Sequence, residues 1–327
     1  PYKFKNKTVH GIIRYLTHQQ DWQVTPSINK LIFDTTPDKT KRYTKLLSGE
    51  CDIITYPAPS QLKHMSNNSN ISLSSQPTSN TSIWAFNSKK APFDQRAVRQ
   101  AFSFAVDKES ILDAVFFQSA MQTNTLLREQ SWARDLRSLD SKQNPTEALK
   151  LLKESDFDFN EVFTILIPIQ NSTYNPNYFK TAELIQANLL EIGVTSTILP
   201  LQEKQLEQRL LAGDYDTYLT GINSLINDPD SLFRPLLSCN VNPLEGNTSQ
   251  WCREDVQKLL DAALLESNFI ARIKYYYRLQ RIIQKERIYY PIAHVLRIDA
   301  FNNNVSGVTV NPLTGINFIN ASKTEAQ

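Results

Sequence analysis

Apolar strand patterns and amphipathic helix patterns alternate without interruption over residues 162–222. The runs VFTILIPI (162–169), TSTILPL (195–201) and TYLTGI (217–222) are typical of strands. Between the first two runs, apolar side chains recur at helical spacing up to Gly193, and KQLEQRLLAGDYD has the same character between the second and the third. A strand–helix–strand–helix–strand order is compatible with few architectures and predicts a mixed α/β lobe.

The flanking sequence predicts further elements around this lobe. The first 84 residues are rich in strand patterns, and TSIWAFN (81–87) is one of them. Helices are expected from about Ala97, from Asp107, and over 145–155, where Pro145 suits a first turn. One long helix is expected from about Arg253 to Lys285, and strand-like sequence then returns the chain. There is no Pro/Ser-rich linker, which favours two lobes joined by hinge strands.

Length and charge restrict the class of protein. A chain of 327 residues is too long for one small core and suits two lobes. An apolar fraction of 41% and a charged fraction of 21% are ordinary for a globular protein. A net charge of +2 is too small to indicate nucleic-acid binding by itself. No run of 18 apolar residues is present, so no membrane insertion is expected. The first residues, PYKFKN, already have a strand pattern, so we expect a segment upstream of them.

Three cysteines are present, and two of them are close in sequence. Cys239 and Cys252 flank a turn-rich loop, and no second CxxC or His pair accompanies them as a zinc site would require. We therefore favour a disulfide over two free thiols, which would indicate an oxidising compartment. Cys51 is either a buried free thiol or half of a second bridge.

Enzyme motifs are absent from the sequence. The four histidines are scattered, and neither GxSxG, a P-loop nor GxGxxG occurs. Asp228 and Asp230 could form a catalytic acid pair. The favoured interpretation is that Asp228-Pro229 makes a turn and Asp230 caps the following helix SLFRPLL. We therefore predict no catalytic residue, no metal site and no cofactor.

A basic stripe is predicted on the segment ARIKYYYRLQRIIQKER (271–287). At helical spacing its bases share one face, and an apolar face lies opposite. This stripe could bind a polyanion, but a solvated helix face is the favoured interpretation. The bases of the stripe are Lys274, Arg278, Arg281 and Lys285.

Several segments in order resemble the extracytoplasmic solute-binding proteins of peptide-type ABC importers, a family with dipeptide-, oligopeptide- and haem-binding members. They include KLLSGECDIITYPAPSQLKHM, WAFNSKKAPFDQRAVRQAFSFAVDKESI, YNPNYFKTAELIQANLLEIGV and DPDSLFRPLLSC. The resemblance implies a two-lobed periplasmic binding protein in which residues 1–84 end lobe I, 85–293 form lobe II, and 294–327 return to lobe I. It also implies that the first part of lobe I, with the partner of Cys51, lies upstream of this chain.

The resemblance implies a ligand site at the mouth of lobe II, and this sequence departs from the family there. Dipeptide-binding relatives have an Asp that pairs with the ligand's ammonium group, and Leu225 stands at that position. Ile222 replaces their Trp, and Asn171 or Ser172 replaces an Arg that pairs with the ligand's carboxylate. A zwitterionic dipeptide should therefore bind poorly, because a buried ammonium without a counter-charge is unfavourable. The candidate ligand-binding residues are Asn171, Ser172, Tyr174, Ile222, Asn223, Leu225 and Asp228.

The functional expectation is transport without chemistry. By resemblance, the protein is a periplasmic monomer that closes on a solute and delivers it to an inner-membrane ABC permease. The solute could be a peptide, including a cationic antimicrobial peptide, or haem or a similar compound. The alternative is a polyanion- or nucleic-acid-binding protein that uses its basic surface, for which strong salt dependence would be diagnostic.

Overall fold

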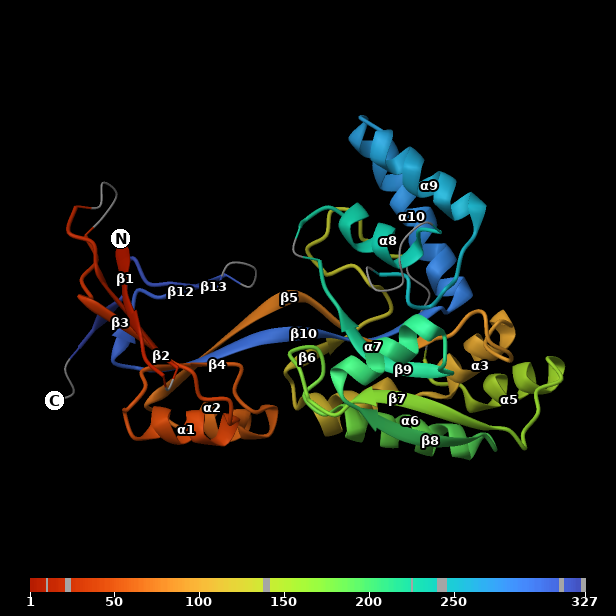
Figure 1. The fold of residues 1–327 in the computed structure, drawn as a ribbon, viewed down its shortest axis with the longest axis horizontal. Helices are drawn as coiled ribbons and strands as arrows, with labels where there is room; N and C mark the ends of the chain where they lie inside the picture. Colours follow the sequence, from red (N-terminus) through yellow and green to blue (C-terminus); the bar gives the residue numbers. More distant parts are fainter. Residues whose placement is uncertain are drawn as a thin grey trace. The chain divides into compact units, whose positions relative to one another are not determined.

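The chain divides into two compact units, which Figure 1 shows as a ribbon. One unit consists of Pro1–Thr78 with Leu296–Gln327, and the other is Ser79–Val295. Both boundaries fall inside long strands, β5 (Ile71–Phe86) and β10 (Tyr289–Asn302), and the boundaries expected from the sequence, 84 and 293, fall inside the same two strands. This computed structural model describes residues 1–9, 11–20, 25–137, 142–224, 226–239, 246–311 and 315–324.

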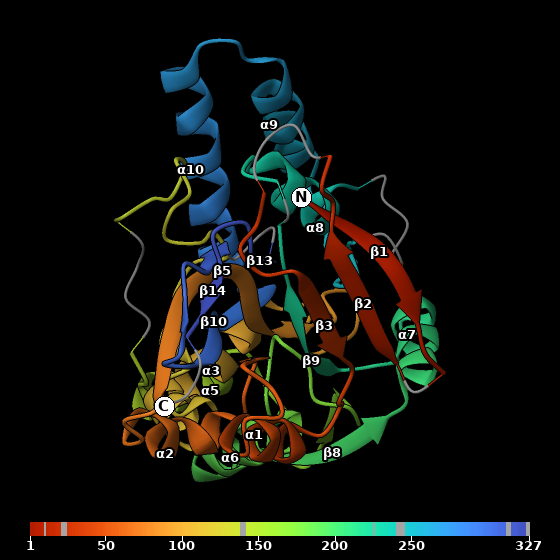
Figure 2. The same cartoon turned by 90° about the vertical axis from the view of Figure 1, so that its left-hand side faces the viewer.

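The first unit combines an antiparallel sheet with two short helices. Strands β1 (Tyr2–Lys7), β2 (Ile12–Thr17) and β3 (Lys30–Asp34) pair in that order and form the red sheet of Figure 2. Strand β4 pairs with β10 through Ile54 and Ala300. The small core of the unit contains Leu46, Ile54, Met65, Ile71 and Ala300. The remaining elements are α1 (Lys39–Leu47), β4 (Ile53–Thr55), η1 (Pro59–Gln61), α2 (Leu62–Ser66), β11 (Val305–Ser306), β12 (Thr309–Asn311), β13 (Gly315–Asn317) and β14 (Ser322–Lys323).

The second unit has the predicted α/β order. Strand β7 (Val162–Pro168) pairs in parallel with β8 (Thr195–Leu201) on one side and with β9 (Thr217–Ile222) on the other. Helices α6 (Tyr178–Glu191) and α7 (Glu203–Ala212) make the two crossovers. The sheet continues from β9 to β5, which is antiparallel to it. The strand–helix–strand–helix–strand prediction is confirmed.

The core of the second unit lies on both faces of its sheet. Along β5, Trp84 and Phe86 belong to one buried cluster, whereas Ile83 and Ala85 belong to another. This division follows from the strand period of two residues, which sends neighbouring side chains to opposite faces. The remaining elements up to β7 are α3 (Arg96–Ala105), α4 (Lys108–Ile111), η2 (Leu112–Phe116), β6 (Ala120–Gln122) and α5 (Pro145–Glu154).

The predicted long helix over residues 253–285 is wrong, because two helices occupy this stretch. They are α9 (Glu254–Leu265) and α10 (Phe269–Glu286), which lie side by side as a hairpin in Figure 2. Asn268 caps α10, since its side chain accepts a hydrogen bond from the Ala271 N–H at 3.0 Å. Asn at this position satisfies an N–H that has no helical partner, so it favours a new helix start over continuation. Within the described part of the chain, no helix has the length and apolar character needed to span a membrane.

Candidate functional site

The candidate site lies at the carboxyl ends of β7 and β9, which are neighbours in the sheet. The chain leaves β7 toward β8 on one side, and it returns past β7 to reach β9 on the other side. In open α/β sheets, such a reversal of strand order creates a crevice at the carboxyl ends, where ligands bind. The candidate ligand-binding residues lie in the loops after these two strands, except Ile222, which is the last residue of β9.

The loop after β7 is held by its own hydrogen bonds. The Tyr178 N–H donates to Asn171 Oδ1 at 3.2 Å, and the Tyr174 N–H donates to Ser172 Oγ at 3.1 Å. Ser172 Oγ also lies 2.9 Å from the Tyr178 hydroxyl. Asn175 is fully buried, and its side-chain amide donates to Thr181 Oγ1 at 2.9 Å. Asn171 and Ser172 therefore fix the loop.

Tyr174 connects the loop after β7 to the end of β9. A Cβ atom added to Gly221, near the end of β9, would lie 2.0 Å from Tyr174 Cγ, so the tyrosine side chain rests directly on the glycine backbone. The adjacent Ile222 is half-buried, and Asn223 is exposed. Burial raises the pKa of the Tyr174 hydroxyl, so Tyr174 stays neutral at physiological pH. Leu225, the remaining candidate of this loop, lies outside the described residues.

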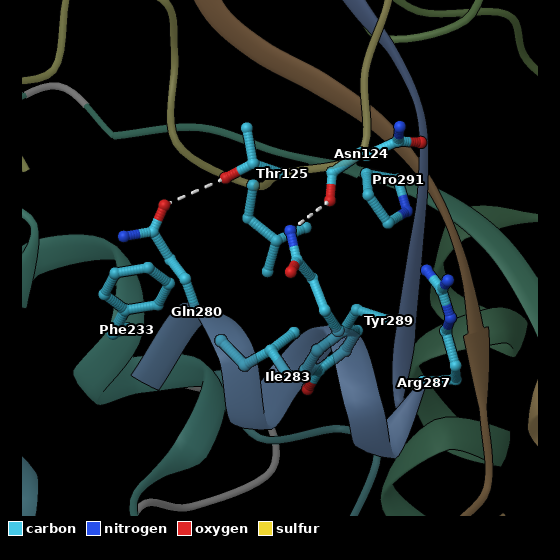
Figure 3. Close-up of a pocket in the computed structure, with 10 residues that line it drawn as sticks. Asn124, Thr125, Phe233, Gln280, Ile283, Arg287, Tyr289 and Pro291 are labelled. Carbon is cyan, nitrogen blue, oxygen red and sulfur yellow. Dashed lines mark hydrogen bonds between the residues drawn. The ribbon is translucent and has the colours of Figure 1, made fainter. Parts of the chain in front are cut away.

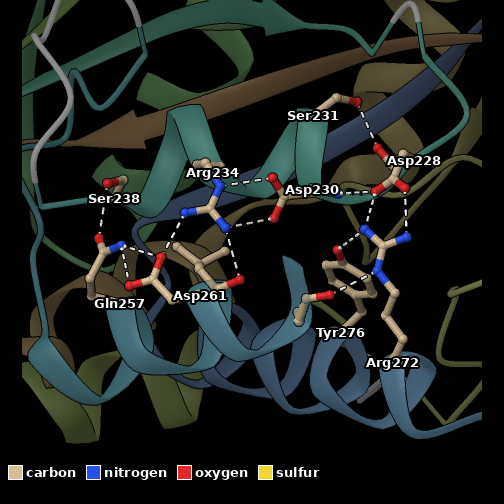
Figure 4. A network of polar contacts seen from close by, with 11 residues as sticks. Asp228, Asp230, Ser231, Arg234, Ser238, Gln257, Asp261, Arg272 and Tyr276 are labelled. Carbon is tan, nitrogen blue, oxygen red and sulfur yellow. Dashed lines mark hydrogen bonds and ion pairs between the residues drawn. The ribbon is translucent and has the colours of Figure 1, made fainter. Parts of the chain in front are cut away.

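Asp228 is matched by an arginine within the same unit. Its carboxylate accepts two hydrogen bonds from Arg272, at 2.7 and 3.0 Å, and a third from the Asp230 N–H at 2.9 Å (Figure 4). Burial lowers the pKa of the Arg272 guanidinium, but the hydrogen bond to Asp228 and the nearby Tyr276 outweigh it, so the pKa is raised. A bidentate pair of this kind satisfies the acid's charge locally. Asp228 therefore contributes little net negative charge to the candidate site.

Asp230 does not cap helix α8 (Asp230–Leu237) with its side chain, so that prediction is wrong. Its carboxylate instead accepts from Arg234 one turn later, at 2.8 and 3.0 Å. Arg234 also donates to Asp261 at 2.9 Å and to the Leu260 carbonyl at 2.8 Å (Figure 4). Arg234 thus ties α8 to α9. The Asp230 side chain is available to pair with Arg234 because Asp228, two residues before Asp230, accepts the free N–H at the start of the helix. The hypothesis of a catalytic Asp228–Asp230 pair has no support in this arrangement, since both acids are engaged by arginines.

A narrow depression beside the acidic turn is lined in part by residues that the sequence did not single out, such as Arg128, and Trp132 lies next to the turn. Arg128 donates to Asn227 Oδ1 at 2.7 Å, and the Trp132 indole N–H donates to the Asn227 carbonyl at 2.9 Å. Ser79 and Ser224 contribute to the same depression, whose apolar lining comes from other residues. Arg128 and Trp132 belong to a segment without helix or strand period, so periodicity alone gave no signal for them. Their proximity to the acidic turn arises only from the fold.

A second cavity, near the start of β10, is a packing gap. It has a volume of about 10 Å³, room for about one water molecule. Figure 3 shows its lining, with Gln280 hydrogen-bonded to Thr125 Oγ1 at 3.2 Å and Gln284 donating to the Asn124 carbonyl at 3.2 Å. These contacts connect α10 to the segment that precedes Arg128. The cavity is too small for a solute.

Two sequence predictions are confirmed around the site. Cys239 and Cys252 form a disulfide, and Cys51 is a free, half-buried thiol. All four bases of the stripe on α10 are exposed, and Tyr276, Leu279 and Ile283 on the opposite face are buried. No cluster of metal-ligating side chains occurs among the described residues. Residues 240–245 of the loop between the cysteines are outside the described part.

One titratable side chain near the depression is deeply buried. His294 on β10 is 5% exposed, and its Nδ1 lies 2.9 Å from Thr81 Oγ1. Burial lowers the pKa of His294 to about 4, and the positive charge of Arg134 acts in the same direction. His294 is therefore neutral at physiological pH and belongs to the core.

The chain belongs to the bacterial extracellular solute-binding proteins of family 5, whose "Middle" profile matches residues 1–243. This match confirms the predicted class, the two-lobed α/β fold of peptide-type ABC solute-binding proteins.

Relatives and solved structures agree with this family. The chain is 31% identical over 318 residues to the probable ABC transporter periplasmic-binding protein SapA of Escherichia coli, covering 97% of this chain and 58% of that protein. It is 30% identical over 315 residues to Heme-binding protein A of Haemophilus influenzae, covering 95% and 57%. The dipeptide-binding protein of Pseudoalteromonas sp. SM9913, solved in complex with Met-Leu, superposes with a TM-score of 0.83 at 32% identity, covering 99% and 64%. The chain thus spans 58% of the SapA sequence that it matches.

Proposed function

We propose that this chain is part of a periplasmic solute-binding protein that captures a peptide, haem or a similar solute and delivers it to an inner-membrane ABC permease. The observation that carries the proposal is the contact of Tyr174, in the loop after β7, with Gly221, near the end of β9, at the carboxyl edge where α/β sheets bind ligands. The relatives support the kind of cargo, since one is named a peptide transport protein and another a haem-binding protein.

The two units correspond, in this proposal, to parts of two lobes, with residues 1–84 and 294–327 in lobe I and 85–293 in lobe II. Strands β5 and β10 each contain a unit boundary, which suits a hinge. A solute would stabilise the closed state by binding it more tightly than the open state.

The charges of the site favour a solute other than a simple zwitterionic dipeptide. Asn171 and Ser172 are neutral and engaged in the loop, and Asp228 is matched by Arg272. A charge-assisted hydrogen bond typically contributes about 1.5–3 kcal/mol, so a dipeptide bound at Asn171, Ser172 and Asp228 would lack both charged partners and bind more weakly by roughly two to four powers of ten.

Native mass spectrometry of the purified protein tests the proposal first, because retained cargo would appear as a mass that denaturation removes. Calorimetry then compares hemin, N-acetylated tripeptides and a panel of dipeptides on the unliganded protein. We expect binding of at least one of the first two classes and no submicromolar dipeptide. Failure of all three classes, with no retained cargo, would contradict the proposed function.

A further inference from the structure

The depression beside the acidic turn combines an apolar wall with one guanidinium group. Its wall includes Leu126, Leu127 and Leu232, and the Arg128 side chain lies at the same depression, half-buried. The hydroxyl-bearing residues Ser79 and Ser131 line it as well. Its volume is about 20 Å³, so only a small terminal group of a solute fits in it.

Arg128 carries the unmatched charge of this depression. The acid that also lines it, Asp228, already accepts two hydrogen bonds from Arg272, at 2.7 and 3.0 Å. Arg128 donates to the neutral Asn227 Oδ1 at 2.7 Å, and across the described residues no carboxylate oxygen lies within 4.0 Å of its guanidinium. A guanidinium has five N–H donors in a planar fork, so the single bond to Asn227 leaves most of the fork for another acceptor.

We propose that Arg128 binds a carboxylate of the solute, so that the cargo presents an acidic group next to an apolar one. This inference rests on the proposed function and adds the chemistry of the cargo to it. The fork of Arg128 matches the geometry of a carboxylate, and Ser79 and Ser131 bring further hydroxyl donors to the lining of the same depression. Arg128 comes from the segment after β6, whereas Asn171 and Ser172 occupy the loop after β7. The carboxylate is therefore bound by a different part of the fold from the one that the dipeptide-binding pattern suggests.

Two carboxylate sources fit this chemistry, the C-terminus of a peptide and a propionate of haem. Each has a matched neutral analogue. We would measure the affinity of the unliganded protein for N-acetyl-trileucine and its C-terminal amide, and for hemin and hemin dimethyl ester. N-acetylation removes the ammonium group, so only the carboxylate differs within the peptide pair.

The expected result is that the acid of one pair binds at least tenfold more tightly than its neutral analogue, because a charge-assisted bond is typically worth tenfold or more. Discrimination in the peptide pair identifies the C-terminus, and discrimination in the hemin pair identifies the propionate. Arg128→Gln should weaken only the acid, to the level of the analogue, and Arg128→Lys should restore part of the difference. Arg278→Gln is the control, because Arg278 is exposed on α10 and does not line the depression.

Equal affinity within each pair would overturn the inference and leave the proposed function standing, provided that the probes bind. Unchanged acid binding in Arg128→Gln would also overturn it. If no probe binds the original protein, the proposed function fails and the inference with it. The comparison of acid with analogue on the unmodified protein needs no variant, so a folding defect of Arg128→Gln would not remove the test.

Discussion

The contact between Tyr174 and Gly221 joins the loop after β7 to the end of β9, and it can be perturbed by one methyl group. In Gly221→Ala, the new Cβ would stand 2.0 Å from Tyr174 Cγ and 2.1 Å from its Cβ, whereas ordinary contacts are 3.4–4 Å. The tyrosine side chain must retreat by more than 1 Å. Its backbone opposes this shift, since the Tyr174 N–H is bonded to Ser172 Oγ at 3.1 Å and the Ser172 N–H is bonded to the Asn175 carbonyl at 3.0 Å.

Overpacking of this kind typically costs about 1–3 kcal/mol, so we expect Gly221→Ala to lower the free energy of unfolding by that amount. In the background Tyr174→Ala the obstacle is absent, and the same substitution should cost less than half as much. Gly→Ala also restricts the unfolded chain, but this effect is the same in both backgrounds and cancels in the double-mutant cycle.

Urea denaturation of the original protein, the two single variants and the double variant gives the coupling free energy. A coupling near zero, with Gly221→Ala equally costly in both backgrounds, would refute the argument that Tyr174 rests on Gly221. Solute affinity measured on the same four proteins reports on the site. We expect Gly221→Ala to weaken solute binding, because the displaced ring links the loop after β7 to the end of β9.

Three further predictions concern other parts of the second unit. The pKa of His294 is lowered from 6.5 to about 4, so the unfolded chain binds a proton that the folded one excludes, and stability should fall by about 2 kcal/mol between pH 7 and pH 5. His294→Gln should remove this loss in denaturation curves at the two pH values, and parallel pH dependence of the two proteins would contradict the assignment. Reducing the Cys239–Cys252 disulfide, which closes a 13-residue separation, should cost about 3 kcal/mol, measured by denaturation with and without reductant, and an unchanged midpoint would count against it. The third prediction replaces three exposed bases of α10 by Ser, namely Lys274, Arg278 and Lys285. Solute affinity should change by no more than about threefold, because exposed charges contribute little at physiological salt. A hundredfold, salt-dependent loss of affinity would instead favour a polyanion-binding function.

Arg281 is left out of that triple variant for a structural reason. Its Nε donates to Asp135 Oδ2 at 3.0 Å, and Asp135 is 3% exposed, so its loss would disturb a buried carboxylate. The helical period of the sequence predicted correctly that Arg281 is exposed. It could not indicate the acid that Arg281 reaches, because Asp135 lies in an irregular segment far away in the sequence.

Local signals predicted most elements of the second unit correctly. Asp107 was expected to start a helix, and its side chain accepts from the N–H groups of Glu109 and Ser110 at 3.0 and 3.3 Å. Pro145 is the first residue of α5, as expected. By contrast, the first half of β5 escaped notice, because ISLSSQPTSN is polar and contains Pro77, and its strand conformation depends on pairing within the sheet.

The site was less predictable than the fold, because its chemistry depends on pairs that are distant in sequence. From the sequence, Asp228 is an acid at a turn, and nothing near it indicates a partner. In the structure it is bonded to Arg272, on the helix that begins after the α9–α10 break. That break at Asn268 was itself missed, so the uninterrupted helix expected over 253–285 offered no basis for bringing Arg272 back to the turn. Once the pair is formed, Asp228 is neutralised and Arg128 becomes the free charge of the depression. The sign of the net charge at the site is therefore set by tertiary pairing, and a positive charge there points to an acidic rather than a basic group on the solute.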